Sequence, residues 1–433
     1  MHLTSKANRI YCYRTRNILK KGPVFWGWYV VFSSFVMLTL IYGARYSFGV
    51  FVKPMFAEYN WPMTVISLAA SINLLMYASA GVFAGWMLDR VAPKWITTVS
   101  VLFTTAGFIA ASFVTSPLGL YLSYGVLVGI GSAGSGAVAC TASIGKWFVK
   151  KRGIAIGIAA MGIGLGTMIM APLAGYIVKS YGWRVGFLCI GALTCIVGIV
   201  MSQIFMGKDH PERYGLQPDG EPLPTRQSNP HPSDGTVGRP SLKPVLADPR
   251  FWLLVACNIF AVMTVMMTFV HQVAYAINSG IDKIEAAAAI GVIGIFGSAG
   301  KFFFGWLCDR IRDAKYSAAL GFLAMAVGMF LLYRTTNVVM LYGFAIFYGF
   351  GYGSLAPVTP YLISDRFGRQ VLGVTYGLLT LFSTGIGGAL GPILGGFIFD
   401  KTGSYRPGWI MNTVFLLIIS LLILALKPKP KEG

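Results

Sequence analysis

Charged side chains are scarce in this sequence. Only 12% of its 433 residues are Asp, Glu, Lys or Arg, whereas 55% are hydrophobic and the mean hydropathy is +0.67. Soluble proteins carry about 25% charged residues, so the composition excludes a chain of ordinary soluble domains. The six cysteines form no C-x-x-C pair, and neither a disulfide framework nor a zinc site is indicated. We expect them to pack as small apolar side chains, and we expect no metal or cofactor.

Long polar stretches are also rare, and the breaks that they make leave twelve apolar spans. Most of these spans reach the ~20 apolar residues that a transmembrane helix needs. They lie near 26–50, 63–87, 95–114, 118–144, 154–178, 184–206, 251–276, 286–308, 316–333, 338–363, 371–398 and 408–426. The chain is therefore predicted to be an all-α membrane protein.

Basic residues outnumber acidic ones by 35 to 15, which by itself could indicate nucleic-acid binding. Their positions favour another explanation. If the N-terminus is cytoplasmic, the cytoplasmic segments hold 26 of the 35 Lys and Arg, and the outer segments hold seven. This asymmetry predicts a multi-pass protein of the cell (inner or plasma) membrane with both termini cytoplasmic. The basic excess is thus a matter of topology, and we expect the lipid bilayer, and no nucleic acid, as a partner.

The stretch 207–250 differs from the rest of the chain because it is rich in Pro, Gly and charge. Such a composition predicts a flexible cytoplasmic linker. The predicted organisation is a basic N-terminus (1–25), a six-helix bundle (26–206), the linker (207–250), a second six-helix bundle (251–426) and a short tail (427–433).

The two predicted bundles repeat each other at an offset of 220 residues. The sequence G-x-x-x-D-R occurs twice at this offset, as Gly85, Asp89 and Arg90 and again as Gly305, Asp309 and Arg310. The same offset relates 171–175 to 391–395, two Pro- and Gly-containing segments. A parallel repeat across a linker is typical of transporters in which two halves move around a midplane site.

These repeated motifs resemble the signature of the major facilitator superfamily, and the resemblance extends over essentially the whole chain. It implies twelve transmembrane helices in two pseudo-symmetric six-helix bundles. It also implies that Asp89, Arg90, Asp309 and Arg310 are gating residues that hold the cytoplasmic side closed. The alternative is that these charges only mark the membrane boundary in a short turn.

Within the superfamily, three segments resemble the branch of monocarboxylate transporters and oxalate/formate exchangers. They are 146–153 (KWFVKKRG), 181–184 (YGWR) and 269–281 (FVHQVAYAINSGI). The resemblance implies a secondary active transporter of small organic anions, most simply mono- or dicarboxylates, that works by alternating access. Other members of the superfamily exchange organophosphate for phosphate and also carry basic residues on the first and seventh helices. An exchanger of that kind is the alternative function.

None of the fifteen acidic residues lies deep within a span, but two cations do, Arg45 and Lys301. A cation at the bilayer centre costs about 2.5–3.5 kcal/mol on insertion scales, so a function is the default expectation. In the resembled branch, an Arg at the position of Lys301 binds the substrate carboxylate. Lysine is a single point donor, so anion binding is kept while its geometry is less tightly specified. The alternative for Lys301 is snorkelling to the interface.

Arg45 and His271 complete the candidate site. With a first helix that starts near Trp26, Arg45 lies about 29 Å along it and so close to the outer face, where snorkelling or an outer gate competes with substrate binding. Aligning Phe25-Trp26 with Phe251-Trp252 places His271 opposite Arg45. This histidine is either a hydrogen-bonded packing group or a protonatable site.

The remaining expectations concern polar residues and coupling. Tyr124 and Asn258 are candidate cavity-lining residues. The resembled proton-coupled carriers often have an Asp four residues before the cation that corresponds to Lys301, where this chain has Gly297. Anion exchange and proton-coupled symport, with the proton as a further partner, therefore both stay open.

No H-E-x-x-H, G-x-S-x-G or membrane-buried carboxylate pair is present, so the protein is not expected to be an enzyme. We expect a monomer.

Overall fold

Twelve helical segments of the computed structural model are long and apolar enough to cross a membrane. The structure describes residues 25–61, 63–88, 90–208, 211–214, 216–220 and 242–428. Each of the twelve spans overlaps one of the predicted apolar stretches, so the fold class is confirmed. Residues 1–24 of the predicted basic N-terminus, most of the linker, Asp89 and residues 429–433 lie outside the described residues.

The first half of the chain supplies six of the twelve spans. Its elements are α2 (Trp26–Tyr46), α3 (Phe48–Tyr59), α4 (Met63–Leu88), α5 (Pro93–Ser112), α6 (Pro117–Leu120), η1 (Tyr121–Val128), α7 (Gly129–Ala133), α8 (Ala137–Trp147), α9 (Arg152–Tyr181), α10 (Trp183–Val200) and η2 (Met201–Phe205). Short α- and π-helical pieces run on from one another, so α2 with α3, and α6 through α8, each make a single span.

The second half supplies the other six spans. Its elements are α11 (Lys243–Ala247), α12 (Pro249–Asn278), α13 (Lys283–Arg310), α14 (Lys315–Arg334), α15 (Val338–Tyr352), α16 (Leu355–Phe367), η5 (Arg369–Val371), α17 (Leu372–Phe382), η6 (Ser383–Gly387), α18 (Gly388–Thr402), α19 (Arg406–Leu422) and η7 (Ile423–Ala425). Between the halves, two short 3-10 turns are described in the linker, η3 (Pro211–Tyr214) and η4 (Pro218–Gly220).

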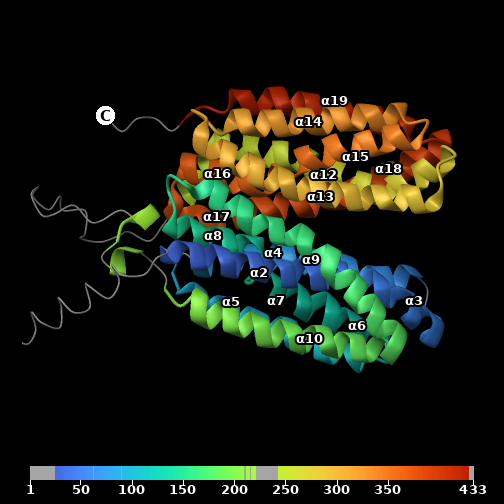
Figure 1. Ribbon diagram of the computed structural model, residues 1–433, viewed down its shortest axis with the longest axis horizontal. Helices are drawn as coiled ribbons and strands as arrows, with labels where there is room; N and C mark the ends of the chain where they lie inside the picture. Colours follow the sequence, from blue (N-terminus) through green and yellow to red (C-terminus); the bar gives the residue numbers. More distant parts are fainter. Residues whose placement is uncertain are drawn as a thin grey trace, which may run out of the picture.

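The helices of each half lie together, the first half in blue to green and the second in yellow to red (Figure 1). The described linker turns lie at one end of the molecule, which we call the linker side. The turn after α3 lies at the opposite end, which we call the far side. Since the spans run alternately between these ends, the starts of α9 and α17 and the ends of α4 and α13 all lie on the linker side.

The two halves pack against each other through α9 with α13 and α4 with α17. Glycines allow the closest approach in each pair. A Cβ on Gly85 would overlap the backbone carbonyl of Gly373, and a Cβ on Gly305 would overlap that of Gly153. The two contacts correspond to each other in the repeat, since the 220-residue offset relates Gly85 to Gly305 and Gly153 to Gly373. The repeat therefore corresponds to a pseudo-twofold interface that is tight on the linker side.

The first span is longer than predicted, and this changes the position of Arg45 along it. The predicted helix ended near residue 50, but the span continues through α3 to Tyr59 after a local break at Ser47. Fourteen residues therefore follow Arg45 in the span, about 21 Å at 1.5 Å per residue. Arg45 therefore lies in the middle part of the span and not near its far-side end, and its depth in the bilayer stays a prediction.

Candidate functional site

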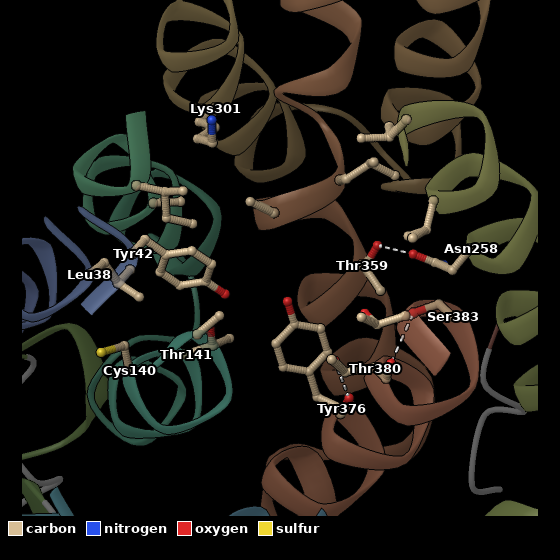
Figure 2. A pocket seen from close by; sticks show the side chains of 18 of the residues that line it. Leu38, Tyr42, Cys140, Thr141, Asn258, Lys301, Thr359, Tyr376, Thr380 and Ser383 are labelled. Atoms are coloured by element: carbon tan, nitrogen blue, oxygen red, sulfur yellow. Dashed lines mark hydrogen bonds between the residues drawn. The ribbon is translucent and has the colours of Figure 1, made fainter. Parts of the chain in front are cut away.

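A cavity of about 200 Å³ lies between the two halves (Figure 2). It is lined by side chains from α2, α4, α8 and α9 of the first half and from α12, α13, α15, α16 and α17 of the second, with two residues of η6. One lining residue, Tyr46, is 52% exposed, so the cavity reaches the molecular surface, while the glycine contacts described above close the interface between the halves on the linker side.

Lys301 of α13 lines this cavity, and its side chain is only 3% exposed. Its Nζ donates to the carbonyl oxygen of Gly297, one turn earlier, at 3.4 Å and lies 5.0 Å from the centre of the Tyr352 ring. Among the residues that the structure describes, no carboxylate forms an ion pair with it. The ammonium group of Lys301 thus has only weak partners within the described part of the protein.

Arg45 of α2 lines the same cavity from the opposite half. Its Nε donates to Oδ1 of Asn73 at 2.9 Å, and its guanidinium lies 4.2 Å from the centre of the Tyr77 ring. Within the described part of the chain, its two terminal nitrogens have no hydrogen-bond acceptor. The carboxamide and the ring hold the guanidinium in place without neutralising it.

Tyr124 does not line the cavity but supports Arg45. Its hydroxyl donates to the carbonyl oxygen of Arg45 at 3.1 Å, and its own carbonyl oxygen accepts from Nδ2 of Asn73 at 2.8 Å. Phe48 stacks on the Tyr124 ring with 4.0 Å between ring centres. Tyr124 and Asn73 therefore fix the backbone and side chain of Arg45 from behind.

Asn258 of α12 does line the cavity, as predicted from its sequence position. Its Oδ1 accepts a hydrogen bond from the Thr359 hydroxyl at 3.0 Å, and its Nδ2 donates to the carbonyl oxygen of Leu254 at 2.9 Å (Figure 2). Both polar groups of the carboxamide are engaged within the second half. Asn258 therefore ties α12 to α16 beside the cavity.

His271 lies away from the two cations. Its Nε2 is 2.9 Å from the carbonyl oxygen of Pro392, and its ring packs 5.1 Å from that of Tyr405. These contacts hold it between α12 and α18, and it is not among the residues that line the cavity. At the 220-residue offset the counterpart of Arg45 is Val265, which lines the cavity. The structure therefore does not place His271 opposite Arg45.

The described residues that line the cavity include two cations and no carboxylate. In the low dielectric of a membrane protein interior, charges without counter-ions create a strong local potential. The cavity is thus a positive site, and its natural complement is an anion.

On the linker side, Asp309 at the end of α13 bridges the halves. Its two carboxylate oxygens accept hydrogen bonds from the backbone N–H groups of Gly153 and Ile154 in the first turn of α9, both at 2.8 Å. Free N–H groups and a partial positive charge at a helix start favour an anionic cap. The sequence motif thus places one carboxylate across the interface that closes this side.

The other predicted gating residues do not bridge the halves in the same way. The guanidinium of Arg90 donates to the carbonyl oxygen of Trp86 at 3.0 Å and lies over its ring, while that of Arg310 lies over the ring of Trp306. Each contact is local and joins a residue near the end of α4 or α13 to the arginine four positions later. Asp89 lies outside the described residues.

The linker supplies a second carboxylate at the same helix start. Asp219 accepts hydrogen bonds from the backbone N–H groups of Val149, Lys150 and Lys151, at 3.0, 2.8 and 3.1 Å. A second linker residue, Glu212, accepts from Arg369 of the second half at 2.9 Å. The described part of the linker therefore touches both halves.

Sequence reasoning missed several residues of this site. They are Tyr77, Tyr352 and Tyr376 in the cavity and Asp219 in the linker. The tyrosines lie in spans that are apolar on all sides, so no periodicity marks their inward face. Asp219 lies in a Pro- and Gly-rich stretch, where the sequence carries no signal for a long-range contact.

Comparison with known proteins identifies the family. A model of the Major Facilitator Superfamily matches residues 34–384 and 280–433. Monocarboxylate transporter 13 of Bos taurus is 26% identical over 407 residues, which cover 93% of this chain and 89% of the relative. Monocarboxylate transporter 4 of Rattus norvegicus is 26% identical over 406 residues, covering 92% and 82% of the two chains.

Solved structures share the fold. The transporter FucP in its outward conformation has a TM-score of 0.69 at 12% identity, with 92% of this chain and 99% of FucP covered. The human organic anion transporter MFSD10 has a TM-score of 0.68 at 13% identity, with 93% and 100% covered. The chain is a multi-pass membrane transporter that belongs to the major facilitator superfamily and resembles its monocarboxylate-transporter branch.

Proposed function

We propose that this protein is a secondary carrier of monocarboxylates that binds its substrate anion between Lys301 and Arg45. The observation that carries the proposal is that these two cations, from opposite halves, line one cavity whose described lining has no carboxylate. A buried cation without a partner is unfavourable unless a ligand compensates it. A carboxylate supplies the compensating charge and accepts hydrogen bonds from both side chains. The monocarboxylate transporters among its relatives support this substrate class.

The same geometry suggests how transport proceeds. In the described state the anion enters from the far side, while Asp309 and the glycine contacts keep the linker side closed. When the anion neutralises the cavity, the two halves can approach around it, and the linker-side contacts then separate. We assign the linker side to the cytoplasm, in accord with the distribution of basic residues. Because one chain builds the whole cavity, we propose that the monomer is the working unit.

We propose anion exchange as the coupling mode. No histidine, Asp or Glu is found among the described residues of the cavity, so a proton has no side chain of these types to occupy beside the substrate. His271 instead packs against Pro392 and Tyr405. After release of the substrate, a return to the starting conformation with an empty cavity would leave two cations uncompensated. We therefore expect the protein to bind a second anion before it returns.

Uptake into proteoliposomes tests this function. Vesicles loaded with unlabelled lactate are expected to take up labelled lactate faster than empty vesicles, with and without a pH gradient. Excess carboxylates should compete and excess phosphate should not. Competition by phosphate without competition by carboxylates would favour the organophosphate/phosphate exchanger. Uptake that requires an inward proton gradient and ignores internal anion would overturn the exchange mode.

A further inference from the structure

We infer that the preferred substrate is a monocarboxylate with an aromatic ring, whose carboxylate lies between Lys301 and Arg45 while the ring lies among the tyrosines of the cavity. This inference rests on the proposed function and makes its substrate class narrower. It follows from the cavity wall, from the cavity volume and from the distribution of charge within it.

The cavity wall contains five tyrosines. Tyr42, Tyr46 and Tyr77 come from the first half, and Tyr352 and Tyr376 from the second. Tyr42 and Tyr376 point toward one another from opposite halves (Figure 2). Aromatic rings prefer edge-to-face and offset contacts with other rings. Side chains from both halves can thus hold a ring in the middle of the cavity.

The polar ends of two of these tyrosines already have partners. The hydroxyl oxygens of Tyr42 and Tyr77 are 2.8 Å apart and hydrogen-bonded. Tyr77 also lies beneath the guanidinium of Arg45, and Tyr352 lies beneath the ammonium of Lys301. Each cation is thus beside an aromatic surface. A ligand with a carboxylate next to a ring matches this alternation of charge and ring.

The rest of the wall is largely apolar. Beside several Thr and Ser hydroxyl groups, it contains the apolar side chains of Leu38, Ile156, Ile163, Val265, Met266 and Leu355. A small, fully polar anion such as oxalate has no apolar body, so it leaves this surface uncovered even where its carboxylates meet Lys301 and Arg45. An apolar body removes the same surface from water, which is favourable.

The volume of the cavity and the charges of its lining further restrict which ligands fit. An apolar cavity of about 150 Å³ is large enough to bind benzene, and this one is about 200 Å³. The described lining contains no Asp or Glu that could pair with an ammonium group. A ring-bearing amino acid is therefore a poorer ligand than the corresponding acid without the amine.

Calorimetric titration of the purified full-length protein in detergent tests the inference, because membrane permeation by weak acids plays no part. The probes are benzoate, lactate, oxalate and phenylalanine. We expect benzoate to bind at least tenfold more tightly than each of the others. Equal or tighter binding of lactate or oxalate would overturn the inference. If lactate exchange still occurs and is lost in Lys301→Gln, the proposed function survives that result. If no carboxylate binds or exchanges, both fail.

Two variants locate the ring. Tyr376→Phe keeps the aromatic surface and should keep the preference for benzoate over lactate. Tyr376→Ala removes the ring and should reduce that preference at least tenfold, with lactate affinity changed less than threefold. An unchanged preference in Tyr376→Ala would contradict the ring position. Tyr42→Ala is the same test from the other half if Tyr376→Ala does not yield monodisperse protein.

Discussion

The carboxylate of Asp309, in the second half of the chain, accepts a hydrogen bond from the backbone N–H of Gly153, in the first half, at 2.8 Å. A second bond of the same length goes to the next N–H, that of Ile154. One acidic side chain therefore caps a helix of the other half, at the end of the molecule where the halves are packed most tightly. This contact has to break before the linker side can open.

Asp309→Asn is expected to weaken linker-side closure. Asparagine has one acceptor oxygen where the carboxylate has two, and it lacks the charge that the helix start favours. The loss of a hydrogen bond to a charged group is worth about 1.5 kcal/mol, a roughly tenfold shift in the equilibrium between states. Spin labels at Val91 and Arg312, in a cysteine-free background, should report a larger population with long distances between them.

Asp400→Asn is the matched control for that change, since Asp400 is exposed near the far-side end of α18. It should leave the distance distribution unaltered. If Asp309→Asn has the same distribution as the parent protein, Asp309 is not a gating residue. The repeat assigns the same role to Asp89, which stays a prediction from the sequence.

Asp219→Ala is expected to act in the same direction. It removes the acceptor of three backbone N–H groups just before α9. Because Asp219 and Asp309 cap neighbouring turns of one segment, their effects should be coupled and not additive. The double variant, measured with the same label pair, should differ from the sum of the single shifts. Strict additivity would mean that the linker acts independently of the gate.

Gly305→Val is expected to prevent tight closure of the linker side. The new side chain would overlap the carbonyl group of Gly153, which is backbone and cannot rotate away. Transport should fall at least tenfold, because one of the two end states is blocked. Gly343→Val is the control, since a Cβ there would meet only a Leu331 methyl group at 3.7 Å. Full exchange by Gly305→Val would show that the glycine contact is dispensable.

Substitution of Asn73 is expected to lower anion affinity in a graded way. Asn73→Ala removes the bond that holds Arg45 at 2.9 Å, and we expect KM for the carboxylate to rise about tenfold, equivalent to about 1.4 kcal/mol. Asn73→Asp should raise KM further, because its carboxylate would neutralise Arg45. A smaller rise in KM for Asn73→Asp than for Asn73→Ala would mean that Arg45 does not act through its charge.

The sequence predicted the fold well because its signals are local and repeated. Span lengths and the paired G-x-x-x-D-R motifs depend only on nearby residues, and the offset of 220 also relates the two glycine contacts between halves. The predicted placement of His271 opposite Arg45 was wrong for a specific reason. Aligning Phe25 with Phe251 implies an offset of 226, whereas at 220 the counterpart of His271 is Phe51. Phe51 is a core residue stacked on Phe187 at 4.1 Å.

The site was harder to predict than the fold. Lys301 and Arg45 were identifiable because a cation in an apolar span is costly. Their tyrosine neighbours were not, since Tyr77 and Tyr352 lie in helices that are apolar all around and give no inward face. The support of Arg45 by Asn73 and Tyr124 depends on how three helices pack, which no local pattern encodes.

The most direct test of the account is the uptake of labelled carboxylate into preloaded proteoliposomes by Lys301→Gln. Glutamine keeps a polar, hydrogen-bonding side chain, one atom shorter than lysine, but removes the positive charge. Lys301→Arg keeps the charge, and Lys401→Gln removes an exposed lysine of the same half. We predict at least a tenfold loss of exchange in Lys301→Gln, substantial exchange in Lys301→Arg and full exchange in Lys401→Gln. Full, saturable carboxylate exchange by Lys301→Gln would contradict this prediction.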